Sequence, residues 1–568
     1  MPSFRRSLAR VAALAGVLPL AGCQYLQFAS FLKRPDDPRP RGHHATTRGP
    51  AFSTPLARTA VDPAADWPAY NGPPTGTRYS PLAEITTANV ATLRPTCTAA
   101  LGERTAMQSG PVVVAGVLYV TSATRTWAID AATCALRWSH RYDYRPKPDY
   151  DLKTNRGVAY LDTPDGPRLF RGANDGRVYA LNARTGEEVW NVRAGDVALG
   201  ETFPAAPVAW RGLVYLGNAG GDNYGVVGRI MAFDVRTGAR VWSTPLIPRA
   251  GAAAATWPAE TDRTPRTGAT TWTSYTIDTL RGLLYVPTGN AGPDFQDADR
   301  PGTNLHTYSV VALDLATGEL RRAWQLLSHD FHDWDVAAAP LLLTTAGGTA
   351  TVAVAGKDGH VYGLLEGGGR RFATPTTTLQ NGDAPLTPAG TRFCPGVQGG
   401  TEWNGPAYAP GPNLLYVGAV DWCTTVRIEP PERLKGKVGI PWTGSARLLE
   451  PFGHMDPRDQ GRGWLTAVDA DDGAVRWRYA SPTPLVAGVL ATAGGLVFTA
   501  DLVGNVLAFD ARSGAERWRT NTGQPIGGGV VSYGVAGRQY LAVASGLHAP
   551  LTWMRTSSEA TVVVYALP

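Results

Sequence analysis

The sequence predicts an all-β protein, an eight-bladed β-propeller built from tryptophan-containing repeats. Two observations carry this prediction. A segment of twelve to fourteen residues, in which an apolar strand ends in Asp or Asn and a second strand ends in Trp, recurs at 127–138, 179–190, 231–242, 311–324, 466–477 and 507–518. In addition, 65 Gly, 45 Pro and 17 Trp accompany only 18% charged residues, as in exported β proteins with many turns.

The spacing of the repeat predicts how the sheets are arranged. The closing Trp residues stand 52 residues apart from 138 to 190 and from 190 to 242, and 41 apart from 477 to 518. Such periods are typical of radial arrays with one four-stranded sheet per repeat. A degenerate copy at 361–372 makes seven. We expect the C-terminal strand, 560–566, to pair with strands near 67–80 and close an eighth blade.

The N-terminal residues predict export rather than a folded domain. Residues 1–22 combine basic residues with an apolar run too short to span a bilayer, as in a secretory signal. Leu-Ala-Gly-Cys at 20–23 resembles the bacterial lipobox, which implies a lipid on Cys23, and Gln24 implies retention at the outer membrane. The alternative is an ordinary cleavage site beside a chance Cys. The composition of 23–66 predicts a flexible tether before a propeller domain at 67–568.

The remaining cysteines fit an oxidising compartment. Besides Cys23 the chain has four, an even number that allows three pairings. Proximity in sequence favours Cys97 with Cys134 and Cys394 with Cys423, and free buried thiols are the alternative.

The charge of the chain excludes one class of partner. A net charge of +6 and a pI near 9.0 are mild for 568 residues. No basic cluster is interleaved with aromatic residues, so the sequence does not predict nucleic-acid binding.

The stretch His-Asp-Phe-His-Asp-Trp-Asp at 329–335 combines carboxylates and imidazoles in a short segment. Three carboxylates and two imidazoles fall within seven residues, just before an apolar run. A carboxylate held beside a cation or cofactor can take a proton from a substrate hydroxyl. A solvated loop whose Asp side chains cap turns explains the same residues, and the stretch alone leaves both interpretations open.

Other motifs accompany this stretch in a fixed order. They are Thr-Thr-Trp at 270–272, Gly-Asn at 289–290, Lys-Asp-Gly at 357–359 and Gly-Gly-Thr-Glu-Trp-Asn-Gly at 399–405. Within this repeat, the ordered set resembles the quinoprotein alcohol dehydrogenases, periplasmic propellers that use pyrroloquinoline quinone (PQQ) and calcium. The resemblance spans nearly the whole chain after residue 66.

The resemblance implies a role for individual residues. Asp335 matches the catalytic base, and Trp272 matches the aromatic plane under the quinone. Taken without the family, a position in the propeller core is the alternative for Trp272, although this Trp stands outside the repeat. A hairpin turn explains Lys357 equally well. In full, the implied cofactor-binding residues are Gln108, Arg156, Trp272 and Lys357, and the implied metal ligands are Asp222, Asn290 and Asp335.

The chain departs from the family pattern at three places. Tyr150 and Asp151 stand where well-known members carry adjacent cysteines against the quinone. Asp222 stands where Glu is usual among the metal ligands. Ala337 stands where lanthanide-using relatives carry a second Asp, which implies calcium as the metal.

The function that the resemblance implies is PQQ- and calcium-dependent oxidation of a small alcohol or related hydroxyl compound. The sequence has no Cys-x-x-Cys-His haem motif, so the expected electron acceptor is a separate cytochrome c or another carrier. Two alternatives lack redox chemistry, namely an outer-membrane lipoprotein propeller that acts as an assembly scaffold and a propeller that binds sugar or polymer. Neither would need Trp272, Asn290, Asp335 and Lys357 together.

Overall fold

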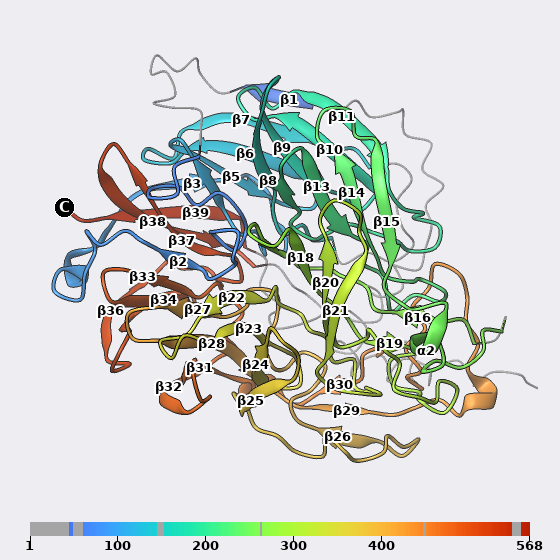
Figure 1. The fold of residues 1–568 in the computed structure, drawn as a ribbon. Coiled ribbons are helices and arrows are strands. Elements are labelled where there is room, and N and C mark those ends of the chain that lie inside the picture. Colours follow the sequence, from blue (N-terminus) through green and yellow to red (C-terminus); the bar gives the residue numbers. More distant parts are fainter. Residues whose placement is uncertain (1–44, 49–60, 145–152, 262–263, 447–449, 548–557) are drawn as a thin grey trace, which may run out of the picture.

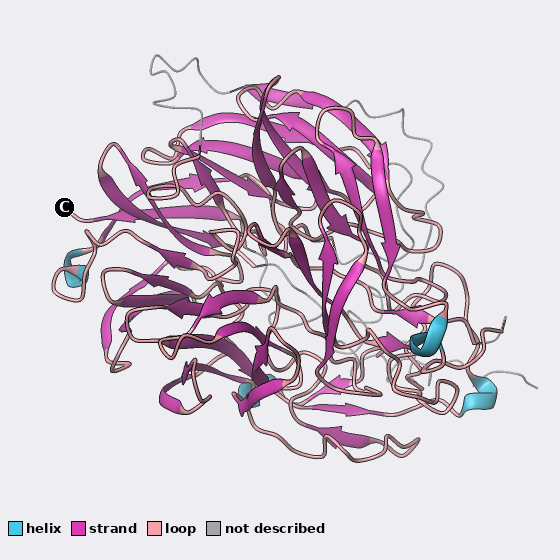
Figure 2. Cartoon of the chain, in the orientation of Figure 1, coloured by secondary structure: helices cyan, strands magenta, loops and turns pink. Residues whose placement is uncertain are grey.

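The computed structural model describes residues 45–48, 61–144, 153–261, 264–446, 450–547 and 558–568. In these residues almost all regular structure is β-strand (Figure 2). Short helical turns occur at η1 (Val90–Thr92), α2 (Gly251–Ala254), η2 (Pro431–Arg433) and η3 (Arg458–Gln460). None of the described helices is long and apolar enough to cross a membrane. The predicted all-β class is confirmed.

The described strands form eight sheets of four or five strands around a common centre, as Figure 1 shows. The first four blades are β4–β7 (Val112–Val114, Val117–Thr121, Arg125–Asp130, Leu136–Arg141), β8–β11 (Ala159–Thr163, Gly166–Gly172, Arg177–Asn182, Glu188–Arg193), β12–β15 (Val208–Trp210, Leu213–Gly217, Arg229–Asp234, Arg240–Pro245) and β17, β18, β20, β21 (Thr276–Asp278, Leu283–Pro287, Ser309–Asp314, Leu320–Gln325).

The next three blades are β22–β25 (Leu341–Thr344, Ala350–Ala355, His360–Leu365, Arg370–Pro375), β27, β28, β31, β32 (Ala407–Ala409, Leu414–Asp421, Arg462–Asp469, Val475–Ser481) and β33–β36 (Leu490–Thr492, Leu496–Ala500, Asn505–Asp510, Glu516–Asn521). First strands of neighbouring blades contact one another, which makes them the innermost strands. Two small sheets lie outside the blades, β16 with β19 (Thr267–Gly268, Ala291–Gly292) and β26, β29, β30 (Thr391–Phe393, Thr424–Val426, His454–Met455).

The eighth blade joins the two ends of the chain. It contains β37 (Val530–Val535), β38 (Arg538–Ser545), β39 (Thr561–Ala566) and β3 (Arg94–Ala100), and β3 pairs antiparallel with β39. The prediction that the C-terminal strand closes the ring is confirmed, but the expected partner near 67–80 was wrong. β2 (Tyr79–Ser80) pairs instead with β33 in the neighbouring blade. The Pro- and Gly-rich residues before it cannot supply a regular strand.

The tryptophan of the repeat connects each blade to the next. Nε1 of Trp138 donates a hydrogen bond to the carbonyl of Ala183, and Nε1 of Trp242 donates to that of Leu315, both at 3.1 Å. A Cβ atom on Gly318 would lie 2.5 Å from the Trp242 ring, so this turn needs glycine. The repeat therefore encodes a contact between neighbouring blades, in which one supplies the indole and the next supplies the glycine turn.

Both predicted disulfides are present. Cys97 bonds to Cys134, and Cys394 bonds to Cys423. Cys97 lies in β3 of the closing blade, whereas Cys134 lies in the turn between β6 and β7. The first disulfide therefore fastens the closing blade to the first one.

Most residues of the predicted signal and tether lie outside the described residues. The expected signal at 1–22 and the lipid expected on Cys23 belong to that part, so both stay predictions. Within the expected tether, β1 (Ala45–Arg48) adds an edge strand to the first blade by pairing with β7. The hydroxyl of Thr46 contacts Nδ1 of His140 at 3.0 Å.

Candidate active site

The residues singled out by sequence gather at one end of the propeller. Adjacent strands are antiparallel, so the loops that enter the innermost strands and the loops between second and third strands share one face. The first kind of loop carries Gln108, Arg156, Trp272 and Asp335, and the second kind carries Asp222, Asn290 and Lys357.

The polar stretch at 329–335 divides into structural and chemical parts. Oδ1 and Oδ2 of Asp330 accept hydrogen bonds from the backbone N–H groups of His332 and Trp334, at 3.2 and 3.1 Å. The His332 ring stacks on Trp334 with centroids 4.2 Å apart and meets the edge of Phe393. These residues hold the shape of the loop.

Asp333 and Asp335 form a buried ion-paired group with Lys357. Nζ of Lys357 lies 3.1 Å from Oδ2 of Asp333 and 3.3 Å from Oδ2 of Asp335, and all three side chains are buried. Burial alone would lower the pKa of Lys357, but Asp333 and Asp335 together raise it above its ordinary value. The ammonium therefore stays charged.

A second set of contacts links Asp335 to a carboxylate that sequence reasoning did not identify. Oδ1 of Asp335 accepts a hydrogen bond from the backbone N–H of Asn290 at 2.9 Å. The side-chain amide of Asn290 donates to Oδ1 of Asp294, also at 2.9 Å. Asp294 is fully buried, and its Oδ2 has no hydrogen-bond partner.

Carboxylates from three blades crowd together at this point. Ligand oxygens of Asp222, Asp294 and Asp333 lie within 4.8 Å of one another. Burial and Asp335 raise the pKa of the half-buried Asp222 to about 6. Burial also raises the pKa of Asp294 well above its ordinary value, and the charge of Asp222 adds to that shift. A cation among these oxygens would relieve the repulsion.

An aromatic and cationic group lies on the same face. The guanidinium of Arg156 lies 4.6 Å from the Trp272 ring centroid and 5.6 Å from that of Trp403. One of its nitrogens donates to Oε1 of Gln108 at 2.7 Å, and another donates to the carbonyl of Trp272 at 2.7 Å. Its Nε is buried without a partner. A flat anionic molecule would find here a stacking surface and a cation.

Glu402 is a further buried acid beside these groups. Its side chain is 7% exposed. Burial raises its pKa to about 7, and Asp335 adds to the shift although Lys357 and Arg156 oppose it.

The structure brings together Gln108, Arg156 and Trp272 in one group, and Asp335, Lys357, Asn290 and Asp222 in another. Tyr150 and Asp151 lie outside the described residues. The sequence motifs contain Asp333, Glu402 and Trp403 but assigned no separate role to them, and they did not include Asp294. The position of Asp294 four residues after Asn290 was the available signal.

Known proteins share this sequence pattern over most of the chain. A family model described as "Glucose/ethanol/alcohol dehydrogenase, beta-propeller domain" matches residues 67–372. Quinoprotein alcohol dehydrogenase PedH of Pseudomonas putida is 30% identical over 83% of this chain and 84% of its own length. The chain belongs to the family of PQQ-dependent alcohol dehydrogenases. It is thus an oxidoreductase of the quinoprotein alcohol dehydrogenase type.

Other members of the quinoprotein family agree with this assignment. Lanthanide-dependent methanol dehydrogenase of Methylacidiphilum fumariolicum is 29% identical over 85% of this chain and 84% of its own length. Among solved structures, a europium-containing methanol dehydrogenase superposes with a TM-score of 0.77 at 26% identity, covering 89% of this chain and 98% of that one. A second family model, "Outer membrane protein assembly factor BamB", matches residues 461–553, which contain two of the repeats.

Proposed function

We propose that the protein oxidises a small alcohol with Asp335 as the base that removes the hydroxyl proton. The observation that carries this proposal is the double anchoring of the Asp335 carboxylate. Asn290 N–H holds one oxygen and the Lys357 ammonium holds the other, at the edge of the Asp222, Asp294 and Asp333 cluster. A carboxylate fixed in this way keeps one orientation, so a substrate hydroxyl can meet it in the geometry that proton transfer needs.

The described residues fit the cofactor and the metal that the family uses. The Arg156 guanidinium, with its unpartnered Nε, offers a site for carboxylates of PQQ, and the Trp272 ring offers a stacking plane. The unpartnered Oδ2 of Asp294 fits a hard cation. When bound, the cation acts as a Lewis acid on the quinone and the quinone accepts the hydride.

The other residues of the site support the base. Lys357 keeps a positive charge beside Asp335 and so favours the ionised carboxylate before proton removal. The rings of Trp272 and Trp403 lie near the Arg156 guanidinium, and the Arg156 side chain is buried.

A non-catalytic scaffold explains these residues poorly. Four carboxylates and an ammonium, largely buried at one face, oppose folding because charged groups lose hydration there. Such groups are concentrated at functional sites. A scaffold would gain nothing from them.

We further propose that the metal is calcium or a lanthanide; Ala337 taken alone implies calcium. The electron acceptor is a separate cytochrome c or similar carrier, since the chain lacks a haem-attachment motif. Export, a lipid anchor on Cys23 and the outer-membrane retention that Gln24 implies stay part of the proposal. The two disulfides support an oxidising compartment.

Absorbance spectroscopy tests the proposed cofactor. The purified chain is mixed with PQQ and either Ca²⁺ or La³⁺, separated from free cofactor, and examined for the quinone spectrum. We expect cofactor to stay with the wild-type chain and to be lost from Arg156→Ala, because the guanidinium holds the anionic cofactor. Equal retention by both proteins, or by neither, would contradict the proposed site.

A further inference from the structure

Asp294 has the features of a metal ligand that no sequence motif identified. Its carboxylate is 0% exposed, one oxygen accepts a hydrogen bond from Asn290, and the other is buried without a partner. An ionised carboxylate left in this state is costly unless a cation completes its coordination. The unpartnered oxygen is therefore an observation that points to a ligand, independent of the acidic cluster around it.

The spacing of the cluster fits one ion. Oxygens of Asp222, Asp294 and Asp333 lie within 4.8 Å of one another. Ligands on opposite sides of a hard cation stand about 4.6–5.2 Å apart, because each metal–oxygen distance is about 2.3–2.6 Å. All three carboxylates can therefore contact the same ion.

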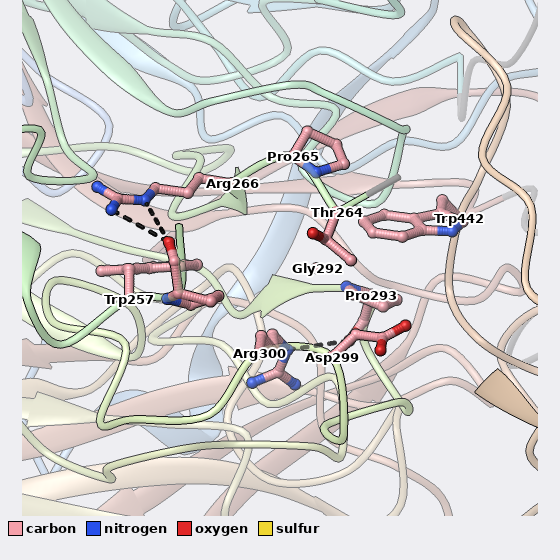
Figure 3. Close-up of a pocket in the computed structure, with 10 residues that line it drawn as sticks. Trp257, Thr264, Pro265, Arg266, Gly292, Pro293, Asp299, Arg300 and Trp442 are labelled. Carbon is pink, nitrogen blue, oxygen red and sulfur yellow. Dashed lines mark hydrogen bonds between the residues drawn. The ribbon is translucent and has the colours of Figure 1, made fainter. Parts of the chain in front are cut away.

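Arg300 holds the backbone next to Asp294 in place. Figure 3 shows Arg300 reaching toward Pro293, and Nε of Arg300 donates to the Pro293 carbonyl at 3.2 Å. The remaining guanidinium nitrogens donate to Asn304 and to the carbonyl of Asp330. Arg300 thus holds both the loop of Asp294 and the loop of Asp333. Its hydrogen bonds go to Asn304 and to backbone carbonyls, not to the carboxylate of Asp294.

The charge of the site distinguishes between ions. Asp222, Asp294, Asp333 and Asp335, together with the ammonium of Lys357, carry a formal balance of −3 when all are ionised. The guanidinium of Arg300 beside Asp294 and the carboxylate of Glu402 beside Lys357 add one charge of each sign, which leaves this balance unchanged. A divalent ion leaves a net negative charge in a mostly buried site, whereas a trivalent ion neutralises it. Uncompensated charge away from water is unfavourable.

We propose that Asp294 ligates the metal ion, supplies the carboxylate that position 337 lacks, and makes the site bind a trivalent lanthanide ion more tightly than calcium. This inference rests on the proposed function, since it concerns the same metal site. It reverses the preference for calcium that Ala337 implied, because the carboxylate of Asp294, from another loop, replaces the one that is absent.

Terbium luminescence of the PQQ-free chain tests the inference without catalysis. Tb³⁺ bound near Trp side chains emits after excitation of the indole, and competing ions reduce the emission. We expect Asp294→Asn to weaken Tb³⁺ binding at least about tenfold, since it removes one anionic ligand. Asp299→Asn is the matched control, because Asp299 belongs to the same loop but lines a small surface pocket outside the cluster (Figure 3). It should bind Tb³⁺ like the wild type.

Competition on the wild-type chain tests the ion preference without any variant. La³⁺ should displace Tb³⁺ at a concentration at least tenfold lower than Ca²⁺, and it should raise the thermal midpoint more than Ca²⁺ at equal concentration. Unchanged Tb³⁺ affinity in a folded Asp294→Asn protein would overturn the ligand assignment. Stronger competition by Ca²⁺ would overturn the ion preference.

PQQ retention distinguishes failure of this inference from failure of the proposed function. Tb³⁺ binding that depends on Asp294 in a chain that retains no PQQ would leave the inference standing and contradict the proposed function. PQQ retention and alcohol oxidation by a chain whose Tb³⁺ binding does not depend on Asp294 would support the proposed function and overturn the inference.

Discussion

The carboxylate of Asp335 and the ammonium of Lys357 lie 3.3 Å apart, and both side chains are buried. The same ammonium lies 3.1 Å from Asp333. Lys357 therefore joins the proposed base to the proposed metal cluster. Its charge offsets part of the negative charge of the four carboxylates.

Lys357→Met should destabilise the metal-free protein. The substitution leaves Asp333 and Asp335 buried beside other carboxylates without their ammonium, and breaking a buried ion pair costs about 3–5 kcal/mol. Added La³⁺ should restore much of the lost stability, because a cation among the carboxylates replaces the missing charge. Urea unfolding with chelator and with La³⁺ measures both effects. Lys435→Met, at an exposed position, is the control, and an equally small effect of both substitutions would contradict the pairing.

Glu402→Gln should become more stabilising as the pH rises from about 5 to 8. The pKa of Glu402 in the fold is raised to about 7 from an ordinary 4.5, so the folded state favours the neutral acid. Stability is therefore lost as pH rises through this range and the acid ionises, whereas Gln stays neutral. The difference in unfolding free energy between the two proteins, measured against pH, checks this. Glu432→Gln, at an exposed site, should show no such slope.

Gly318→Ala should destabilise the propeller more than Gly348→Ala. Both glycines have positive φ, +72° and +80°, so both substitutions carry a backbone cost of about 1–2 kcal/mol. A methyl group on Gly318 also meets the Trp242 ring, whereas one on Gly348 meets nothing within 4 Å. We expect an extra loss of about 1–3 kcal/mol for Gly318→Ala in urea unfolding. Equal losses would show that the indole of the neighbouring blade does not require this glycine.

Replacing Cys97 and Cys134 together by Ala should loosen the closure of the ring. The bond spans 37 residues and ties β3 to the first blade, and loops of that size contribute about 3–4 kcal/mol. Non-reducing peptide mapping of the wild type verifies the pairing. In hydrogen exchange, the variant should lose protection first in β3 and β39. Loss spread evenly over all blades would argue against a local role at the closure.

The blades could be predicted from sequence because their signal is local. Each repeat holds the strand, the Asp or Asn turn and the Trp within fourteen residues or fewer, and contacts between neighbouring blades repeat the same pattern. The partner of the C-terminal strand could not be predicted from such a local pattern. β3 and β39 are separated by nearly the whole chain, and β3 carries no copy of the repeat.

The site was predictable in part for the same reason. Short motifs identified Asp335, Asn290 and Lys357, whose ordered spacing resembles the family. Asp294 could not be identified in this way, because only the fold brings it close to Asp222 and Asp333 from other loops. Likewise, the sequence alone could not decide whether 329–335 is a functional site or a structural loop. The structure shows that Asp330 accepts hydrogen bonds from the backbone, whereas Asp333 and Asp335 pair with Lys357.

Asp335→Asn tests whether Asp335 is the base that removes the hydroxyl proton. The change keeps the shape of the side chain and removes its basic site, so PQQ retention should persist while turnover of an alcohol falls by at least about a hundredfold. Turnover is measured by reduction of an artificial electron acceptor, with the metal and PQQ saturating, and Asp299→Asn serves as the control. A folded, PQQ-loaded Asp335→Asn protein with nearly full turnover would contradict the account and would transfer the role of base to Asp333.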